Sequence, residues 1–536
     1  MTDPWKKLEP VFLMLAVGFS RFALRSHKLY DLDSVNFALG MQRFCPRVHQ
    51  PHPPGYFLYI CLARLVDLFV HDANLALVLV SIAASSATIA VIYKLGVDWF
   101  GRMEARFAST VFLFSPLGWF HGIVALTYSV EAFFSGLLAL LCWRLNLGNL
   151  SMILPAAVTL GISAGIRPSS LVFLGPLYLY SLRKLSPGQK LLSAAVLMGT
   201  VAAWFLPMIL LSGGLSAYFE ALATLWRAVP SKGTIFNSSP ANTIARAFVI
   251  LFIGLLMCGG SSFIVLDAFR RKISVDAEKI RFTLVWITPA LSFYTFIFLK
   301  FVNSGYLLLL LPPISIWVGY WVAEWYRDSA SRALYKLPLI AVCITINTLC
   351  FLVSPLYCSY RSVRQLEAQL QDVTAALPLA ASPEDTVVIG FDSHFLGYRH
   401  AGYYLPGYLT IEYPEVHYPD GSRVFSLEHR KTNLTDELPW RGYKRFVLFP
   451  LPTGDPGYVA YMNEVERLLP RRSLEMRHIG NCDFVSGPIT LLPLLFPATT
   501  QVSKSAVYPL LHSGGRDMYT NVNTSSLEHS RNQVSR

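Results

Sequence analysis

The sequence predicts a polytopic α-helical membrane protein that carries a C-terminal extracytoplasmic α/β domain. Of its 536 residues, 53% are hydrophobic and only 15% are charged, whereas soluble globular domains carry about 25% charged residues. Apolar stretches approaching the length that crosses a bilayer, roughly 20 residues, recur between residues 8 and 358. Beyond residue 358 the composition becomes that of an ordinary soluble domain.

These observations predict three regions. We expect a transmembrane domain over residues 1–358, with its first outer loop at 26–74. A soluble extracytoplasmic domain should follow over residues 359–498. The tail, residues 499–536, is rich in Ser, Asn and His and is expected to be disordered.

The second region has the pattern of an α/β domain. An amphipathic stretch at 362–377 predicts a linker helix, and TVVIGF (386–391) and RFVLFP (445–450) predict buried strands. A helical pattern at 458–469 follows. Strands that alternate with helices in this way are typical of α/β folds.

The Lys and Arg residues predict the orientation in the membrane, because cytoplasmic loops are enriched in them. Residues 56–70 contain Arg64 and Asp67 and are short, so we expect them to lie at the outer interface. The basic loops then all fall on the cytoplasmic side, and about eleven spans remain. They are residues 10–23, 75–97, 108–121, 131–143, 152–166, 169–182, 191–211, 247–266, 282–299, 306–321 and 337–355.

The net charge of +12 does not indicate nucleic-acid binding. The basic residues lie mainly in short loops between apolar segments, and no basic cluster is interleaved with aromatic residues that would stack on bases. Membrane lipids are therefore the expected surroundings, and nucleic acid is not an expected partner.

Ionisable residues from at least five separate segments gather at the predicted outer face. Charged groups inside or at the ends of spans are costly and usually functional. The set is Asp31, Asp33, His49, His52, His121, Glu131, Arg167 and Lys300. Their convergence, more than any single residue, predicts an outward-facing active site in an integral membrane protein.

Taken singly, these residues have structural alternatives. Glu131 begins an apolar helix, where the helix dipole favours an acid. Arg167 and Lys300 stand at helix ends, where long cationic side chains extend toward the membrane–water interface. For His121 the alternative is a structural histidine that binds no ligand. The spacing of His49 and His52 in a proline-rich loop is not the helical spacing of metal ligands, so no zinc site is predicted at these two histidines.

Two outward-facing carboxylates beside cations suit a particular chemistry. A carboxylate can act as the general base that deprotonates an acceptor hydroxyl or amine. Basic groups can hold a phosphate leaving group and stabilise its charge. In a bilayer this combination indicates a lipid-phosphate donor whose head group is transferred at the membrane surface.

Residues 31–44 (DLDSVNFALGMQRF) and 49–59 (HQPHPPGYFLY) resemble the first outer loop of the GT-C membrane glycosyltransferases. The pattern is most similar to the protein O-mannosyltransferases and the aminoarabinose-type lipid A transferases. Asp33 matches the first acid of that loop. Residues 126–134 (LTYSVEAFF), with Tyr128 and Glu131, resemble the second acidic element, and residues 300–313, with Lys300 and Tyr306, resemble the basic and Tyr-Leu-Leu-Pro element.

The resemblance implies an inverting glycosyltransferase that uses a polyprenyl-phosphate-sugar donor and a glycan, lipid or protein acceptor on the extracytoplasmic face. Asp33 would be the general base, and Asp31 and Glu131, the other two catalytic residues, would help position the acceptor or a metal. The implied substrate-binding residues are His49, His52, His121, Tyr128, Arg167, Lys300 and Tyr306. Among them, Lys300, Arg167 and His52 would hold the donor phosphate.

The loop departs from the family pattern at Ser34, where the family often has Glu. Asp31 would then supply the second carboxylate, which leaves open whether Asp31 or Asp33 takes the proton. It also leaves open whether a divalent ion, Mg²⁺ or Mn²⁺, takes part.

Two other functions remain as alternatives. A transporter or flippase of a lipid-linked sugar would favour internal repeats and ionisable residues at mid-membrane, but no repeat is evident and the charges cluster at one face. A membrane anchor without activity would tolerate the loss of all the outer acids.

Overall fold

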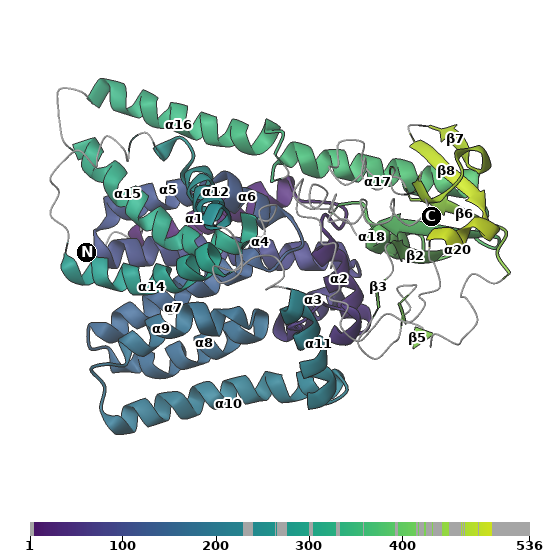
Figure 1. Ribbon diagram of the computed structural model, residues 1–536. Coiled ribbons are helices and arrows are strands. Elements are labelled where there is room, and N and C mark those ends of the chain that lie inside the picture. The colour runs from purple at the N-terminus through teal and green to yellow at the C-terminus, as the bar shows by residue number, and fades with distance from the viewer. Residues whose placement is uncertain are drawn as a thin grey trace, which may run out of the picture. The chain divides into compact units, whose positions relative to one another are not determined.

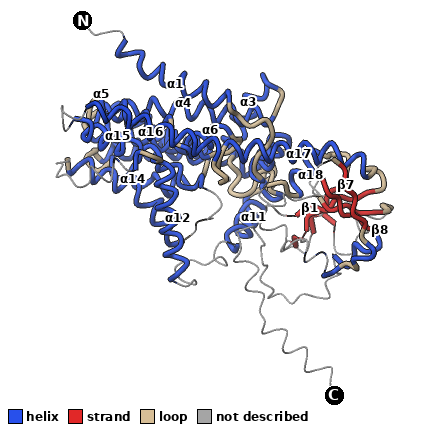
Figure 2. Tube along the Cα trace, turned by 90° about the horizontal axis from the view of Figure 1, so that it is seen from above, coloured by secondary structure: helices blue, strands red, loops and turns tan. Residues whose placement is uncertain are grey.

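The computed structural model describes residues 5–228, 240–262, 264, 276–297, 299, 304–327, 333–356, 358–391, 395–413, 416–417, 423–424, 431–432, 442–449, 463, 465, 467–480 and 482–495. The chain forms two compact units, Met1–Gln365 and Leu366–Arg536. Figure 1 labels their elements. Figure 2 shows that the described strands belong to the second unit and that the first is helical.

The helical unit begins with α1 (Trp5–Ala23), α2 (Leu32–Gln42) and α3 (Phe57–Val70). Its further helices are α4 (Ala73–Trp99), α5 (Arg102–Leu113), α6 (Pro116–Ile123), α7 (Tyr128–Asn146), α8 (Ile153–Ile166), α9 (Ser169–Ser181), α10 (Pro187–Leu211), α11 (Leu215–Ala228), α12 (Pro240–Cys258), α14 (Ala277–Phe296), α15 (Leu311–Arg327) and α16 (Ala333–Val353). The 3₁₀ helix η4 (Ser304–Leu310) leads directly into α15.

Each of the eleven expected spans contains helix, and the helical membrane class is confirmed. Among the described residues, however, six helical segments are long and apolar enough to cross a bilayer: Ala73–Trp99, Tyr128–Asn146, Pro187–Leu211, Pro240–Cys258, Ser304–Arg327 and Tyr335–Val353. The count of eleven therefore stays a prediction.

The segment expected as one span at 108–121 is instead two helices, α5 and α6. Ser115 caps α6 by accepting a hydrogen bond from the backbone N–H of Gly118 at 3.3 Å. Pro116 then occupies the first turn of α6, where its missing N–H costs nothing. The Ser-Pro pair is the local cause of the break.

Helix α3 is too short to cross alone. Its 14 residues at 1.5 Å each span about 21 Å, against roughly 30 Å for the hydrocarbon core. Arg64 donates hydrogen bonds to the backbone carbonyls of Met41 at 2.8 Å and Gly40 at 2.9 Å, so its charge caps the end of α2. Leu65 and Phe69 are exposed, as expected for a helix lying at an interface.

Close packing around α4 and α5 builds the core of the helical unit. Helix α4 lies against α1, α5 and α7, and α5 lies against α15. A Cβ on Gly319 of α15 would lie 2.3 Å from the backbone nitrogen of Ala108. Small residues allow such approaches between membrane helices, and this packing fixes α7 and η4, which both carry residues of the candidate site.

Ion pairs tie the helices together at the end opposite the N-terminus of α7. Arg144, near the end of α7, pairs with Asp98 in the last turn of α4 at 2.9 Å. Arg327 at the end of α15 pairs with Glu104 in the first turn of α5. Part of the basic charge of these loops is therefore already matched by acids.

Helix α17 (Tyr360–Ala380) leads into the second unit. The described part of that unit contains β1 (Thr386–Phe391), α18 (Tyr398–Tyr404), β2 (Leu409–Tyr413), β3 (Val416–His417), β4 (Arg423–Val424), β5 (Lys431–Thr432), β6 (Arg445–Leu448), β7 (Glu475–Ile479), β8 (Cys482–Pro488) and the short α20 (Leu492–Leu495). Strands β3, β4 and β5 pair antiparallel in a small sheet of their own.

The larger described sheet has the strand order β2-β1-β6-β8-β7. Strand β1 runs parallel to β2 and β6, whereas β8 is antiparallel to β6 and β7. Val387, Ile389, Ile411 and Phe446 pack in its core. The strands expected at 386–391 and 445–450 are present, and most of the helix expected at 458–469 lies outside the described residues.

Candidate active site

Asp31 forms the N-cap of α2. One of its carboxylate oxygens accepts a hydrogen bond from the backbone N–H of Asp33 at 2.8 Å. In return, the Ser34 hydroxyl accepts one from the backbone N–H of Asp31 at 3.4 Å. This capping box satisfies two backbone donors at the helix start, so the buried Asp31 carboxylate holds the backbone that presents Asp33.

Asp33 lies beside His52. Its Oδ1 is 3.4 Å from Nδ1 of His52, and the two side chains are 23% and 16% exposed. The other ring nitrogen of His52, Nε2, is 3.0 Å from the Tyr56 hydroxyl. The carboxylate of Asp33, the imidazole of His52 and the phenol of Tyr56 thus form a row, the Asp33 row. The Asp33 carboxylate lies at one end of this row and is exposed enough for a ligand to reach it.

The turn that carries His52 packs against α2. The ring of Phe37 on α2 lies 5.9 Å from that of His52 and 5.2 Å from that of Tyr56, measured between centroids. A Cβ on Gly40 would lie 2.8 Å from Cδ of Pro51. Glycine at this position therefore lets the turn approach α2 closely enough for His52 to reach Asp33.

Arg167, between α8 and α9, forms a buried ion pair with Glu131 in the first turn of α7. Arg167 Nη1 is 3.4 Å from Glu131 Oε2, and the side chains are 8% and 2% exposed. Nη1 also donates to the Thr127 hydroxyl at 3.5 Å. The guanidinium lies over the rings of Tyr128 at 4.6 Å and Tyr306 at 5.3 Å, so Arg167 does not reach for the interface.

Two buried side chains near this ion pair have polar atoms open to a ligand. Neither carboxylate oxygen of Glu131 makes a hydrogen bond with any described residue, and the same holds for Nδ1 of His121. Nε2 of His121 is 3.2 Å from the Ser304 hydroxyl, and its ring lies 5.2 Å from that of Tyr128. Because buried polar atoms are nearly always bonded, these atoms are candidates for binding a polar ligand.

Tyr56 and Tyr306 connect the two halves of the site. Burial raises the pKa of Tyr56 above its usual value; the positive charge of Arg167 opposes this, and the negative charge of Asp33 adds to it. The Tyr306 hydroxyl likewise interacts with the charges of Arg167, Asp33 and Glu131. Since such interactions weaken with distance and screening, the Asp33 row and the Arg167 pair both lie near these two tyrosines.

The structure thus brings together most of the residues expected in the site: Asp31, Asp33, His52, His121, Tyr128, Glu131, Arg167 and Tyr306. His49 lies in the same loop, with a left-handed φ of 58°, and its part in the site stays a prediction. Lys300 falls outside the described residues. No group of three or more His, Cys, Asp or Glu side chains in the described part of the chain is arranged to hold a metal ion.

Three neighbours of these residues were not expected from the sequence. Tyr56 directly follows Pro53-Pro54-Gly55, and its place after these turn residues was a usable signal. Thr127 precedes Tyr128 and binds Arg167. Tyr294, whose ring lies 5.7 Å from that of Tyr306, comes from the apolar α14 and gave no signal.

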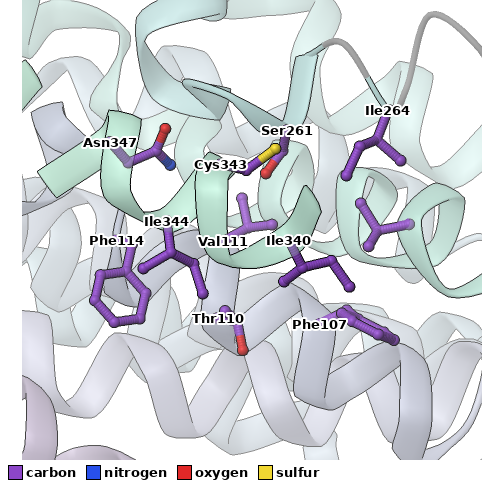
Figure 3. Close-up of a pocket in the computed structure, with 11 residues that line it drawn as sticks. Phe107, Thr110, Val111, Phe114, Ser261, Ile264, Ile340, Cys343, Ile344 and Asn347 are labelled. Carbon is purple, nitrogen blue, oxygen red and sulfur yellow. The ribbon is translucent and has the colours of Figure 1, made fainter. Parts of the chain in front are cut away.

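A separate pocket lies between α5, α15 and α16. Figure 3 shows side chains from α5, among them Phe107 and Thr110, and from α16, among them Ile340 and Ile344. Its lining is mainly apolar and contains none of the residues expected in the active site. The pocket is therefore distinct from the polar site at Asp33 and Arg167.

The fold of this chain is similar to those of solved members of the GT-C superfamily of membrane glycosyltransferases. The structure is similar to ArnT from Cupriavidus metallidurans bound to undecaprenyl phosphate, with a TM-score of 0.58 at 11% identity over 94% of this chain and 100% of that chain. The apo form of that ArnT gives a TM-score of 0.53 at 12% identity, over 92% of this chain and 99% of that one.

A second relative in fold is the archaeal oligosaccharyltransferase AglB from Archaeoglobus fulgidus, in complex with an inhibitory peptide and a dolichol-phosphate. Its TM-score is 0.50 at 10% identity, over 92% of this chain and 78% of that chain. Residues 47–188 match the family model of the protein O-mannosyl-transferase TMEM260 N-terminal domain. No curated protein matches the sequence. The resemblance to GT-C glycosyltransferases is therefore confirmed.

Proposed function

We propose that this protein is an inverting glycosyltransferase that moves a sugar from a polyprenyl-phosphate donor to an acceptor hydroxyl at the extracytoplasmic face of the membrane. The observation that carries the proposal is a part-exposed carboxylate, Asp33, in the same cluster of residues as a buried cation, Arg167, which lies over the ring of Tyr306. Sugar transfer from a lipid phosphate needs both a base and a group that stabilises a phosphate.

Asp33 is the base in this mechanism. It takes the proton of the acceptor hydroxyl while the acceptor oxygen attacks the anomeric carbon from the side opposite the phosphate. The new bond joins the acceptor oxygen to that carbon, and the bond from the carbon to the phosphate oxygen breaks, so the anomeric configuration inverts. Asp31 is less suited to this role because its carboxylate caps α2.

Arg167 stabilises the leaving phosphate, which carries the electron pair of the broken bond. A guanidinium has five N–H donors, and the ion pair with Glu131 and the bond to Thr127 both use Nη1. The remaining donors are therefore available to phosphate oxygens. Lys300, by its place in the sequence, is proposed as a second cation for the same phosphate.

Glu131 and His121 are proposed to bind the sugar. Both present buried acceptor or donor atoms that no described residue satisfies, and sugar hydroxyls are suitable partners for both. Tyr128 and Tyr306 flank Arg167 and can offer ring faces to the sugar.

The relatives guide the choice of substrates. One solved relative is bound to undecaprenyl phosphate, and another is in complex with a dolichol-phosphate. The matching family domain is named for protein O-mannosyl transfer. A polyprenyl-phosphate mannose donor and a protein hydroxyl acceptor are therefore the first pair to test, ahead of glycan and lipid acceptors.

The test uses the full chain purified into lipid nanodiscs, with radiolabelled dolichyl- or undecaprenyl-phosphate mannose and a panel of protein, glycan and lipid acceptors. We expect labelled product from the wild-type protein. Asp33→Asn should lower the rate by about 10²–10⁴-fold, the usual contribution of a positioned general base. Full transfer by Asp33→Asn would show that Asp33 is not the base.

Asp72→Asn is the matched control. Asp72 is an exposed N-cap of α4 that accepts a hydrogen bond from the Leu75 N–H at 2.7 Å, and Asn caps helices about as well as Asp. Its activity should equal that of the wild type.

Translocation of the labelled donor across liposomes without covalent transfer to any acceptor would instead support the transporter alternative, although neither the matching family domain nor the solved relatives described above are transporters.

A further inference from the structure

We propose that His52 is a positioning residue that holds the carboxylate of Asp33 in the orientation needed for proton transfer, and that Tyr56 in turn fixes the orientation of His52. The inference deepens the proposed function and rests on Asp33 being the base. It changes the role expected for His52, which the family resemblance had placed at the donor phosphate.

The geometry of the row supports this role. Nδ1 of His52 is 3.4 Å from Asp33 Oδ1, and Nε2 is 3.0 Å from the Tyr56 hydroxyl. The imidazole is also packed between aromatic rings, because the ring of Tyr56 lies 4.8 Å from it and that of Phe37 lies 5.9 Å from it. The ring therefore has little freedom to turn away from Asp33.

The Asp33 carboxylate and the Tyr56 hydroxyl together favour the tautomer of His52 that carries its proton on Nδ1. An ionised carboxylate only accepts hydrogen bonds, whereas a phenol can donate or accept. Tyr56 is buried, and burial raises the pKa of its hydroxyl above the usual value, so it stays protonated and can donate to Nε2. A neutral imidazole has one N–H and one acceptor nitrogen. When Nε2 accepts from Tyr56, the proton is on Nδ1, the nitrogen that lies 3.4 Å from Asp33 Oδ1.

Nδ1 makes no hydrogen bond with any described residue, but contacts of this kind are often long before the substrate binds and shorten in the complex. On this proposal the Nδ1–H then engages Oδ1 and holds the carboxylate of Asp33 in one orientation toward the acceptor hydroxyl. The same logic operates in the serine protease triad, where a hydrogen bond to one ring nitrogen sets the tautomer and orientation of the catalytic histidine. Here the histidine orients the carboxylate.

The row also makes transfer depend on pH. The charged and titratable groups of the site around this row are Asp31 and Asp33 on α2, Tyr56 before α3, His121 on α6, Tyr128 and Glu131 on α7, Arg167 after α8, and Tyr306 on η4. If His52 gains a second proton, its positive charge stabilises the Asp33 anion and makes it a weaker base. Transfer should then fall as the pH drops through the range in which histidines gain protons, about 5–8.

Three variants of His52 test the proposal in the nanodisc assay. The amide nitrogen of Asn falls near the position of Nδ1 and that of Gln near Nε2, so His52→Asn retains a donor toward Asp33 and His52→Gln does not. We expect His52→Ala and His52→Gln to lower kcat by about 10–100-fold, as the loss of residues that orient catalytic ligands does, with little change in the KM for the donor. His52→Asn should recover most of kcat.

The pH profile gives the second readout. The wild type should lose activity toward acid pH in the histidine range, and His52→Asn should lack this acid limb because it has no imidazole to protonate. His71→Asn serves as the control, since His71 is an exposed residue at the other end of α3, with a left-handed φ of 51° that Asn tolerates. It should keep the rate and the acid limb of the wild type.

The outcomes separate this inference from the proposed function. If Asp33→Asn is inactive while His52→Ala keeps the kcat and acid limb of the wild type, the positioning role is wrong and the base assignment stands. If His52→Asn is as inactive as His52→Ala although both bind donor normally, orientation by a hydrogen bond is wrong. If His52→Ala raises the donor KM and leaves kcat unchanged, His52 belongs to the donor phosphate instead. If Asp33→Asn is fully active, the proposed function itself has failed.

Discussion

The guanidinium of Arg167 and the carboxylate of Glu131 face each other across 3.4 Å between two helix ends, and both are buried. Charge-assisted hydrogen bonds usually measure about 2.7–2.9 Å, so this pair is an ion pair without a close hydrogen bond. A ligand can therefore bind to either partner without first breaking such a bond, which is the property that a site for a sugar phosphate requires.

Arg167→Gln should destabilise the protein and abolish transfer. Breaking a buried ion pair leaves an unmatched charge and costs about 3–5 kcal/mol, which thermal unfolding in detergent would report as a lower Tm. The double variant Glu131→Gln/Arg167→Gln leaves no unmatched charge and should regain most of that stability. It should remain inactive, because the cation for the phosphate is absent. A single variant as stable as the wild type would contradict the structural part of this account.

Local features of this chain could be predicted from the sequence. The strand predicted at 386–391 coincides with β1. It could be predicted because a short apolar run rich in β-branched residues is typical of a buried strand. The short helix after Tyr56 was expected at the interface on the strength of Arg64 and Asp67. Arg64 proves to cap α2 through two carbonyls.

Relationships between distant residues could not be predicted in the same way. The sequence placed Glu131 and Arg167 on one face, but their pairing depends on how α7 packs against α8 and α9. Tyr294 joins the site from an apolar helix without any polar pattern around it. The sequence predicted one span at 108–121 and not the break between α5 and α6, because the Ser115-Pro116 pair lies within a continuous apolar stretch.

Asp31 and Asp33 should respond differently to substitution. Asp31→Asn should retain most transfer, because Asn caps a helix about as well as Asp. Asp31→Ala removes the cap and should lower the free energy of unfolding by about 1 kcal/mol, with a matching drop in Tm. Equal losses of transfer in Asp31→Asn and Asp33→Asn would instead show that the two carboxylates share the chemistry.

Gly40→Ala should impair the loop that carries His52. The added Cβ would lie 2.8 Å from Cδ and 2.9 Å from the nitrogen of Pro51, and overpacking of this kind costs about 1–3 kcal/mol. We expect lower kcat together with lower Tm. Gly199→Ala on α10 is the control: a Cβ there would meet nothing within 4 Å, and alanine in a helix is more favourable than glycine by about 0.5–1 kcal/mol. A stable and fully active Gly40→Ala would show that the turn does not need this close approach.

The hydroxyl of Tyr218 on α11 donates a hydrogen bond to the backbone carbonyl of Pro54 at 3.1 Å and so supports the turn beside His52. Burial raises the pKa of Tyr218 to about 12, whereas an unfolded tyrosine titrates near 10. The folded protein therefore keeps the Tyr218 proton up to a higher pH than the unfolded chain does. The contribution of this proton to the free energy of unfolding is complete below about pH 10. It should be lost as the pH rises from there toward 12.

Tyr218→Phe should lower the free energy of unfolding at neutral pH by about 0.5–1.5 kcal/mol and flatten the decline of Tm above pH 10. An identical alkaline decline in Tyr218→Phe and wild-type protein would show that other tyrosines, and not this contact, govern the alkaline response.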